Sequence, residues 1–191
     1  MKKILVVFAA LLVFSACAKA QEVKPEQPKS RTKIEAFEAQ TGSVIVRGFS
    51  DMGTIQGELG TSVSVESREF INAATGKKEY GIGIGVDEGG RLERKNTSYI
   101  DYDEIDALVK GIDYISKITK DVTPMENFQA DYRTRGDFRA STFSSGGSVE
   151  AGVSSGTIGG ARAFLSLAEL TRLRELLVAA KQKLDSVKTT S

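Results

Sequence analysis

The chain contains no histidine and no tryptophan, and its single cysteine is Cys17. Histidine carries the proton in most serine and cysteine hydrolases, and histidine and cysteine are the usual ligands of zinc, haem iron and iron–sulfur clusters. This composition excludes those nucleophilic and metal sites, and one cysteine cannot form an internal disulfide. An enzyme built from this chain would depend on carboxylates, Lys, Arg, Tyr or Ser. We therefore assign no catalytic residue, no cofactor and no metal ligand.

The chain also lacks a hydrophobic run long enough to span a bilayer, which requires about 20 residues. Its main apolar run, 4–14, has 11 residues; it follows the basic Lys2 and Lys3 and precedes the small residues of 15–20. This order is typical of a secretory signal peptide, here residues 1–20. We expect an exported protein, located in a bacterial cell envelope (periplasmic or lipid-anchored) or secreted.

Two cleavage sites compete within this signal. Ala18-Lys19-Ala20 fits an A-x-A site and would give a soluble protein that starts at Gln21. Ser15-Ala16-Cys17 resembles a bacterial lipobox, which implies that Cys17 is lipidated and anchors the mature protein to a membrane, although Phe14 replaces the usual Leu, Val or Ile. An unpaired cysteine is unusual in an exported protein, and this favours lipidation.

The chain also has no excess of basic residues. The full chain has a net charge of +1, and cleavage after Ala20 removes three of the 26 basic residues and none of the 25 acidic ones, which leaves −2. Nucleic-acid affinity depends mainly on clustered Lys and Arg, so the charge balance disfavours a nucleic-acid partner. The length of 191 residues and the 40% of hydrophobic residues suit one ordinary globular domain.

Beyond the signal, residues 21–33 are polar and contain two of the three prolines, which indicates an extended tether. Residues 34–188 are expected to form one globular domain made of two halves, 34–120 and 125–188. Alternating apolar residues and glycine-bearing turns predict antiparallel strands, and a three-to-four spacing predicts one helix at the end of each half. The expected strands are 34–39, 43–49, 54–59, 63–73 and 79–86, then 127–134, 138–144, 148–154 and 158–165; the expected helices are about 103–119 and 168–187.

The two predicted helices repeat each other at a constant offset of 65 residues. Leu108 aligns with Leu173 and Ile112 with Leu177, and a capping box is expected at each start, Asp101 with Glu104 and Ser166 with Glu169. The sequence thus predicts an α+β fold with an internal duplication, in which each helix covers the strands of its own half. This order of elements is similar to the Whirly and PUR class of domains, and the resemblance implies single-stranded nucleic-acid binding as one alternative function.

Three local motifs have a functional and a structural interpretation. The acidic run at 101–106 could bind calcium, but it lacks the glycine and distal glutamate of a calcium loop, so we interpret it as helix capping. The glycines Gly81, Gly83 and Gly85 could cradle a phosphate, but they alternate inside a strand, which favours close packing. Arg135-Gly136-Asp137 matches an integrin-binding tripeptide, and a simple turn explains it equally well.

One face of the second sheet is expected to be polar and rich in Arg, Asp and Ser. Tyrosines and arginines could line a ligand surface there: Tyr80, Tyr99, Tyr102, Tyr114, Tyr132, Arg133, Arg135 and Arg139. The same pattern is also expected of the solvent-exposed face of a half-buried sheet. The leading hypothesis, based on the predicted export, the predicted tether and the lack of catalytic side chains, is a non-catalytic binding or interaction module. The alternative is a hydrolase that uses two carboxylates, with the candidates Glu66, Glu69, Asp131 and Asp137.

Overall fold

The computed structural model describes residues 30–90 and 94–190. The predicted signal peptide, both cleavage sites, Cys17 and residues 21–29 of the predicted tether lie outside the described residues. Within the described part of the chain, no helix combines the length and the hydrophobicity that a membrane span requires.

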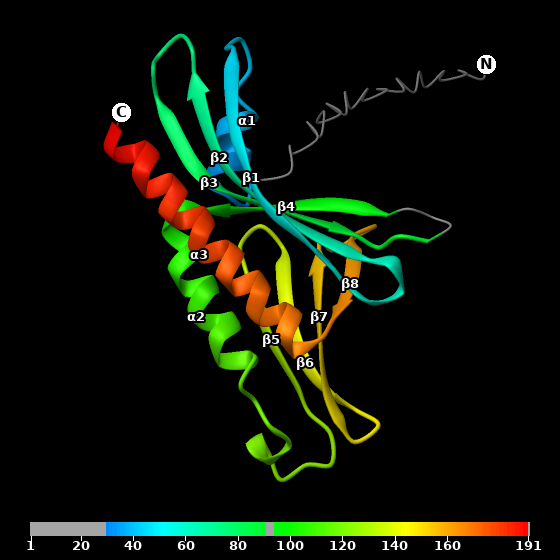
Figure 1. Ribbon diagram of the computed structural model, residues 1–191. Helices are drawn as coiled ribbons and strands as arrows, with labels where there is room; N and C mark the ends of the chain where they lie inside the picture. Colours follow the sequence, from blue (N-terminus) through cyan, green and yellow to red (C-terminus); the bar gives the residue numbers. More distant parts are fainter. Residues whose placement is uncertain (1–29, 91–93, 191) are drawn as a thin grey trace, which may run out of the picture.

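The first half forms a four-stranded antiparallel sheet, sheet A, in the order β1-β2-β3-β4 (Figure 1). The short helix η2 and the helix α2 follow it. The bounds are β1 Ile45–Gln56, η1 Glu58–Gly60, β2 Ser62–Asn72, β3 Lys78–Asp87, β4 Lys95–Asp101, η2 Tyr102–Glu104, α2 Ile105–Ile115 and η3 Lys120–Val122.

The second half repeats this plan with a four-stranded antiparallel sheet, sheet B, in the order β5-β6-β7-β8, followed by helix α3. The bounds are β5 Gln129–Arg133, β6 Phe138–Ser145, β7 Ser148–Ser155, β8 Ala161–Leu165 and α3 Leu167–Thr190. Two meanders, each followed by a helix, confirm the predicted α+β class. The hydroxyls of Ser98 in β4 and Ser155 in β7 form a buried hydrogen bond of 2.8 Å that joins the two sheets.

The helical repeat is confirmed position by position. Helix α2 buries Ile105, Leu108, Ile112 and Ile115, and α3 buries Leu170, Leu173, Leu177 and Ala180. Each member of the second set lies 65 residues after its counterpart in the first. Burial of each large side chain stabilises the fold by roughly 1.5–3 kcal/mol, so these two rows of buried helix residues are a main source of stability.

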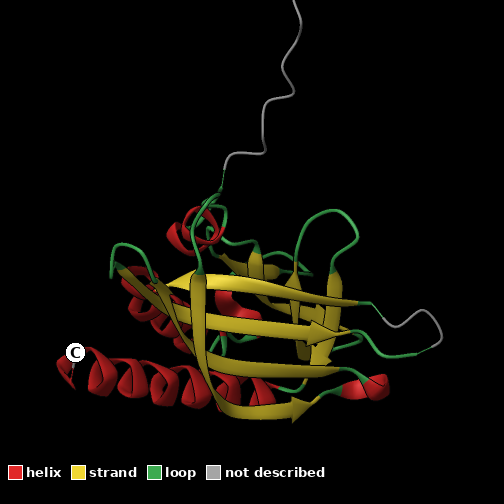
Figure 2. Ribbon diagram, turned by 90° about the horizontal axis from the view of Figure 1, so that it is seen from above, coloured by secondary structure: helices red, strands yellow, loops and turns green. Residues whose placement is uncertain are grey.

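The expectation that each helix covers its own half is wrong for α2, and it holds only for a minor part of the contacts of α3, those with β7 and β8. Helix α2 packs on β5 and β6, whereas α3 packs chiefly on β1, β2 and β3, and the two helices also contact each other (Figure 1). Viewed from above, the C-terminal helix α3 runs along one side of the sheets (Figure 2). The apolar spacing specifies which stripe of a helix is buried but does not specify the sheet that buries it. Both halves therefore share one hydrophobic core.

Residues 34–39, expected as a strand, belong to the short helix α1, Lys33–Glu38. Thr32 and Glu35 form a capping box at its start, so residues 32 and 33, assigned to the tether, are part of the fold. Ile34 and Phe37 pack against Phe70 on the outer face of sheet A. Burial on this second apolar surface favours the helix over the extended alternative.

The expected strands 43–49 and 54–59 are one continuous strand, β1, with a bulge between Asp51 and Gly53. Gly53 has a φ of 133°, which favours glycine, and this explains why the sequence resembles a turn there. Strand β4 was not predicted. It lies at one edge of sheet A and pairs only with β3.

Candidate functional site

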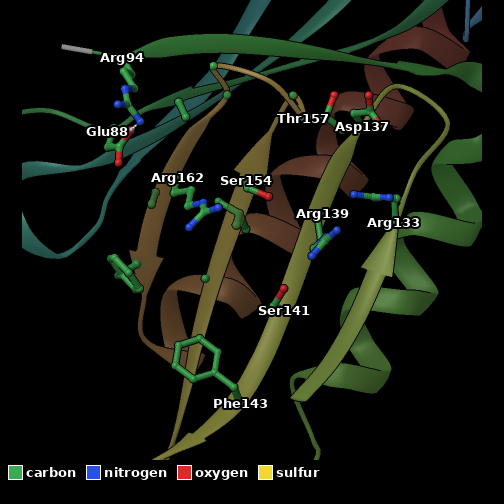
Figure 3. Close-up of a pocket in the computed structure, with 18 of the residues that line it drawn as sticks. Glu88, Arg94, Arg133, Asp137, Arg139, Ser141, Phe143, Ser154, Thr157 and Arg162 are labelled. Carbon is green, nitrogen blue, oxygen red and sulfur yellow. Dashed lines mark ion pairs between the residues drawn. The ribbon is translucent and has the colours of Figure 1, made fainter. Parts of the chain in front are cut away.

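Sheet B has one face in the core and one face open to solvent. Its inner face is built largely from small buried residues, Ala140, Ala151, Ala161 and Ala163. Because side chains alternate along a strand, the intervening residues point outward. The outer face carries a hollow of about 800 Å³, within the range of roughly 300–1,000 Å³ that is usual for ligand pockets (Figure 3).

A row of arginines crosses this hollow from strand to strand. Arg133 in β5 lies opposite Arg139 in β6, Arg139 lies opposite Ser154 in β7, and Ser154 lies opposite Arg162 in β8. The four side chains extend from the same face of the sheet in Figure 3. We call these four residues the arginine row. Three guanidinium groups and one hydroxyl group are thus arranged across the sheet.

The arginine row carries positive charge that the rest of the fold does not neutralise by contact. Among the described residues, none of its three guanidinium groups forms an ion pair with a carboxylate. Arg133 and Arg139 lie directly opposite each other, and like charges in that position on a sheet repel each other. Such an arrangement is typical of a site that binds an anion.

The carboxylates at the rim of the hollow have partners of their own. Glu88 lies 3.8 Å from Arg94, and Asp137 forms an ion pair with Arg31. Neither carboxylate is therefore needed to balance the arginine row. Arg94 adds a further positive side chain to the lining of the hollow.

A polar and aromatic row lies next to the arginine row. It consists of Asp131, Ser141, Gly152 and Phe164, which are consecutive partners across β5 to β8. Asp131 accepts hydrogen bonds from Ser141 Oγ at 2.5 Å and from the Gln129 amide at 3.0 Å.

The carboxylate of Asp131 is held in its ionised form. Burial, the largest single influence, raises its pKa, but the hydrogen bonds from Gln129 and Ser141 and the charges of Arg139 and Arg133 together lower the pKa below its usual value. Asp131 therefore remains an acceptor of hydrogen bonds at neutral pH.

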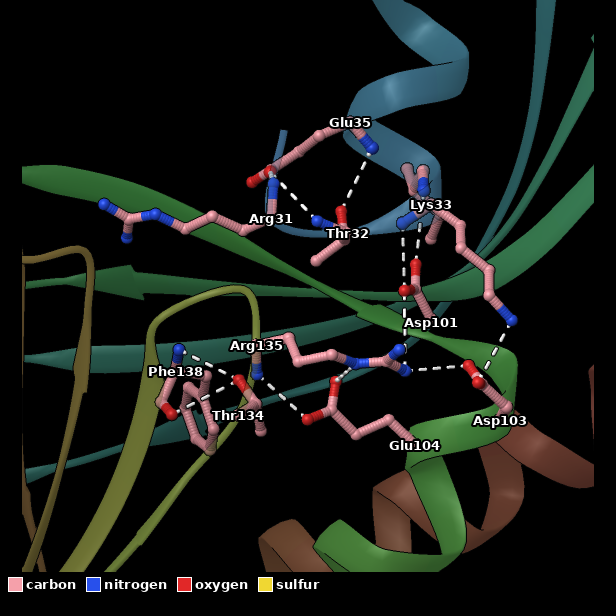
Figure 4. A network of polar contacts seen from close by, with 11 residues as sticks. Arg31, Thr32, Lys33, Glu35, Asp101, Asp103, Glu104, Thr134, Arg135 and Phe138 are labelled. Atoms are coloured by element: carbon pink, nitrogen blue, oxygen red, sulfur yellow. Dashed lines mark hydrogen bonds and ion pairs between the residues drawn. The ribbon is translucent and has the colours of Figure 1, made fainter. Parts of the chain in front are cut away.

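The acidic run at 101–106 has a different role from the one predicted (Figure 4). Asp101 accepts hydrogen bonds from the backbone amides of Lys33 at 2.9 Å and Ile34 at 3.2 Å, so it caps α1. Arg135 lies 2.8 Å from Asp103 and 3.3 Å from Glu104. These partners draw Asp101 and Glu104 away from the expected capping box.

The second predicted capping box is confirmed. Ser166 Oγ accepts a hydrogen bond from the backbone amide of Glu169 at 3.2 Å, and the Glu169 carboxylate accepts one from the backbone amide of Ser166 at 2.6 Å.

No described group of three or more acidic, cysteine or histidine side chains has a geometry that could hold a metal ion.

The tripeptide Arg135-Gly136-Asp137 is engaged within the protein. Arg135 and Asp137 have the ion pairs given above, and a Cβ at Gly136 would lie 2.1 Å from the carbonyl oxygen of Tyr99. The glycine run is engaged too, because a Cβ at Gly81 would lie 2.3 Å from Ile34 Cδ1. Close packing, and not ligand binding, accounts for both motifs.

The predicted set of tyrosines and arginines is dispersed: Arg133 and Arg139 meet on the outer face of sheet B, and Tyr80 and Tyr102 meet around Lys188. Tyr99 packs edge-on against Phe70, and its ring centroid lies 5.4 Å from the Arg68 guanidinium carbon. Tyr102 contacts Lys188, and Tyr132 packs toward Gly111 of α2. Tyr80 also contacts Lys188, whereas Tyr114 is exposed.

Sequence reasoning missed Arg162 and Ser154. The signal was the alternation in 161–165, where Arg162 and Phe164 stand between Ala161, Ala163 and Leu165 and therefore point to the outer face.

Each of the four hydrolase candidates contacts a neighbouring side chain. Glu66 lies 2.6 Å from Arg68 and Glu69 lies 3.2 Å from Lys78, both on sheet A. Asp131 and Asp137 lie on β5 and on the β5–β6 turn, and each has its own partner, as described above. Each carboxylate therefore serves a local contact.

No protein family, curated protein or solved structure matches this chain.

Proposed function

We propose that this chain is an exported, non-catalytic binding module of the bacterial cell envelope or its surroundings, and that the outer face of sheet B binds an anionic ligand. The observation that carries the proposal is the arginine row, whose three cationic side chains form no ion pair within residues 30–90 and 94–190 and line a hollow of about 800 Å³. Guanidinium groups form bidentate hydrogen bonds with carboxylates and phosphates. The hollow and its charge are suited to that task.

Inorganic tripolyphosphate is a suitable probe for this site. We expect its titration into the mature protein to shift the Nε–Hε NMR signals of Arg133, Arg139 and Arg162 in a saturable manner. Arg139→Gln should weaken binding by about tenfold or more, because a hydrogen bond to a charged group contributes about 1.5–3 kcal/mol. The matched control is Arg172→Gln, which removes the same charge from an exposed position on α3. Equal losses in both variants would contradict the proposal.

The proposal of export rests on residues 1–20 and has its own test. Expression of the full chain in a bacterium, followed by mass spectrometry of the mature N-terminus, should find either an acylated Cys17 or a free Gln21. A protein that retains residues 1–20 would contradict export.

Single-stranded nucleic-acid binding is the second candidate. The observation in its favour is that the aromatic Phe143 and Phe164 line the same hollow as the arginines, since positive grooves with exposed aromatics bind single strands. A ten-residue oligothymidine tests it directly. If this candidate is correct, the oligothymidine binds more tightly than tripolyphosphate does.

A further inference from the structure

Gly152 forms an open floor between two aromatic side chains on the outer face of sheet B. Phe164 of β8 lies directly opposite Gly152, and the Phe143 ring of β6 comes within 3.9 Å of the position that a Cβ at Gly152 would occupy. Phe164 is 44% exposed. A residue with a side chain at position 152 would fill the space between the rings, so glycine leaves room there for a flat group.

This floor lies one row below the arginine row, as the cross-strand pairs show. Ser154 and Gly152 are two residues apart on β7 and both point outward, at a distance of about 6.8 Å for two steps along a strand. Phe143 stands at the lower part of the same hollow in Figure 3, below Ser141 and Arg139. A ligand of the size of a sugar ring can therefore reach the arginines and the aromatic floor together.

On the outer face of sheet B, the rows beyond the arginine row carry negative side chains. Asp131 lies in the next row, and Glu150, paired with Phe143, lies in the row after it. Both are exposed. Carboxylates accept hydrogen bonds from hydroxyl groups and repel a second anionic group. The face is thus suited to one anionic group at the arginine row and to hydroxyl groups beyond it.

Resting on the proposed function, we infer that this face binds an acidic sugar, a hexose ring that carries one oxyanionic group. The oxyanion accepts hydrogen bonds from Arg139, Arg162 and the Ser154 hydroxyl. The C–H groups of the ring, which are slightly positive, lie against the negative faces of the Phe143 and Phe164 rings, over Gly152. Ring hydroxyls donate hydrogen bonds to the carboxylate of Asp131.

The oxyanion can be the carboxylate of a uronic acid or the phosphate of a phosphorylated sugar, because the arginine row recognises both. A polynucleotide is a poorer match. A phosphate chain that follows the strands would place its next charges against Asp131 and Glu150, and the arginine row spans only four strands.

The test compares sugar-bearing anions with bare anions by NMR titration of the mature protein. Glucuronic acid is paired with acetate, and glucose 6-phosphate with inorganic phosphate. We expect at least one sugar anion to bind about tenfold more tightly than its bare partner. Phe164→Ala should abolish that advantage without changing the affinity for the bare anion, whereas Arg139→Gln should weaken both. Val46→Ala, which shortens another exposed apolar side chain far from β8 in the sequence, is the control for Phe164→Ala.

The outcomes separate the two proposals. If bare anions bind at the arginine row and the sugar anions bind no better, the acidic-sugar inference is overturned while the anion site stands. If none of the anions, tripolyphosphate included, shifts the arginine signals, both fail. Tighter binding of the ten-residue oligothymidine than of every sugar anion would also overturn the inference, and it would assign the aromatic floor to nucleobases.

Discussion

The hydroxyl of Ser67 donates a hydrogen bond to the backbone carbonyl of Ala180, 3.1 Å away, and so joins β2 of the first half to α3 of the second. The reverse connection exists as well, since Thr142 of β6 donates to the carbonyl of Ile115 in α2, also at 3.1 Å. Ala180 lies 65 residues after Ile115, so the two acceptors occupy the same position in the repeat. Each half therefore donates one buried hydrogen bond from its sheet to the helix of the other half, at equivalent positions of the two helices.

These two hydroxyl groups should contribute similarly to stability. We expect Ser67→Ala and Thr142→Val each to lower the free energy of unfolding by about 1 kcal/mol, because each removes one buried hydrogen bond. Urea denaturation of the two variants measures the loss. Thr54→Val, at an exposed position of β1, is the control and should change stability little. A loss at one site only would show that the two contacts are not equivalent.

Gly111 of α2 should resist substitution by alanine. A Cβ at this position would lie 2.2 Å from the Tyr132 ring, although alanine is the better helix former by about 1 kcal/mol. We expect Gly111→Ala to destabilise the fold by about 1–3 kcal/mol through overpacking. Thermal and urea denaturation measure the change.

The Tyr132→Ala background provides the control, because the clash is then absent. There, Gly111→Ala should stabilise the protein, and the two effects together define a coupling energy. The same loss in both backgrounds would contradict the packing explanation. At the equivalent position of α3 the large and small residues are exchanged. Leu176, 65 residues after Gly111, supplies the large side chain there, and it packs against a glycine, Gly53 of β1.

The arginine row should be a source of instability in the absence of ligand. Arg139 lies between Arg133 on one side and Ser154 on the other, so Arg139→Gln removes the repulsion from the directly opposite Arg133, together with a smaller attraction to Asp131 in the next row. We expect a gain of about 0.2–1 kcal/mol at low salt, measured by urea denaturation. The gain should shrink as the salt concentration rises, because salt screens exposed charges. Arg172→Gln should show neither effect, and a destabilised Arg139→Gln would argue against the repulsion.

Arg135 should make the stability of the fold depend on pH in the acid range. Burial, the largest single influence, raises the pKa of Asp103, but the hydrogen bonds and charges of Arg135 and Lys33 lower it below its usual value. A carboxyl whose folded-state pKa is depressed stabilises the fold above the unfolded value of about 3.9, and this contribution is lost as the pH falls through the folded-state pKa.

The variant Arg135→Gln tests this linkage. At neutral pH it should lower stability by about 1–3 kcal/mol, because it also withdraws a charged partner from Asp101, which is almost fully buried. The difference between the native protein and the variant should shrink below about pH 4. Urea denaturation at pH 3 and pH 7 measures it, and a difference that is independent of pH would contradict the proposed role of Asp103.

The elements whose patterns are strictly local were predictable. The stripe Ile105, Leu108, Ile112 and the alternation along β2 specify helix and strand without reference to the rest of the chain. Helix α1 was missed because six residues with Ile34 and Phe37 also fit a short strand, and only Phe70 on sheet A decides between them. The packing of each helix on the sheet of the other half could not be predicted for the same reason, because it depends on contacts between distant segments.

The candidate site was predictable only in part. Arg133 and Arg139 could be placed on one outer face, because they follow each other across a predicted hairpin. Arg162 required the register of β8 against β7, which no local pattern provides. In the described part of the chain these arginines form no ion pairs, whereas Arg135 has three carboxylate partners. This difference depends on the three-dimensional arrangement of distant segments.

The reciprocal placement of α2 and α3 means that neither repeat can become a complete folding unit when it is cut from the other. Each meander would lose the helix that covers most of its apolar face, because α2 packs on β5 and β6 and α3 packs chiefly on β1, β2 and β3. Two copies of a single repeat could close the same structure if the helix of each copy packed on the meander of the other.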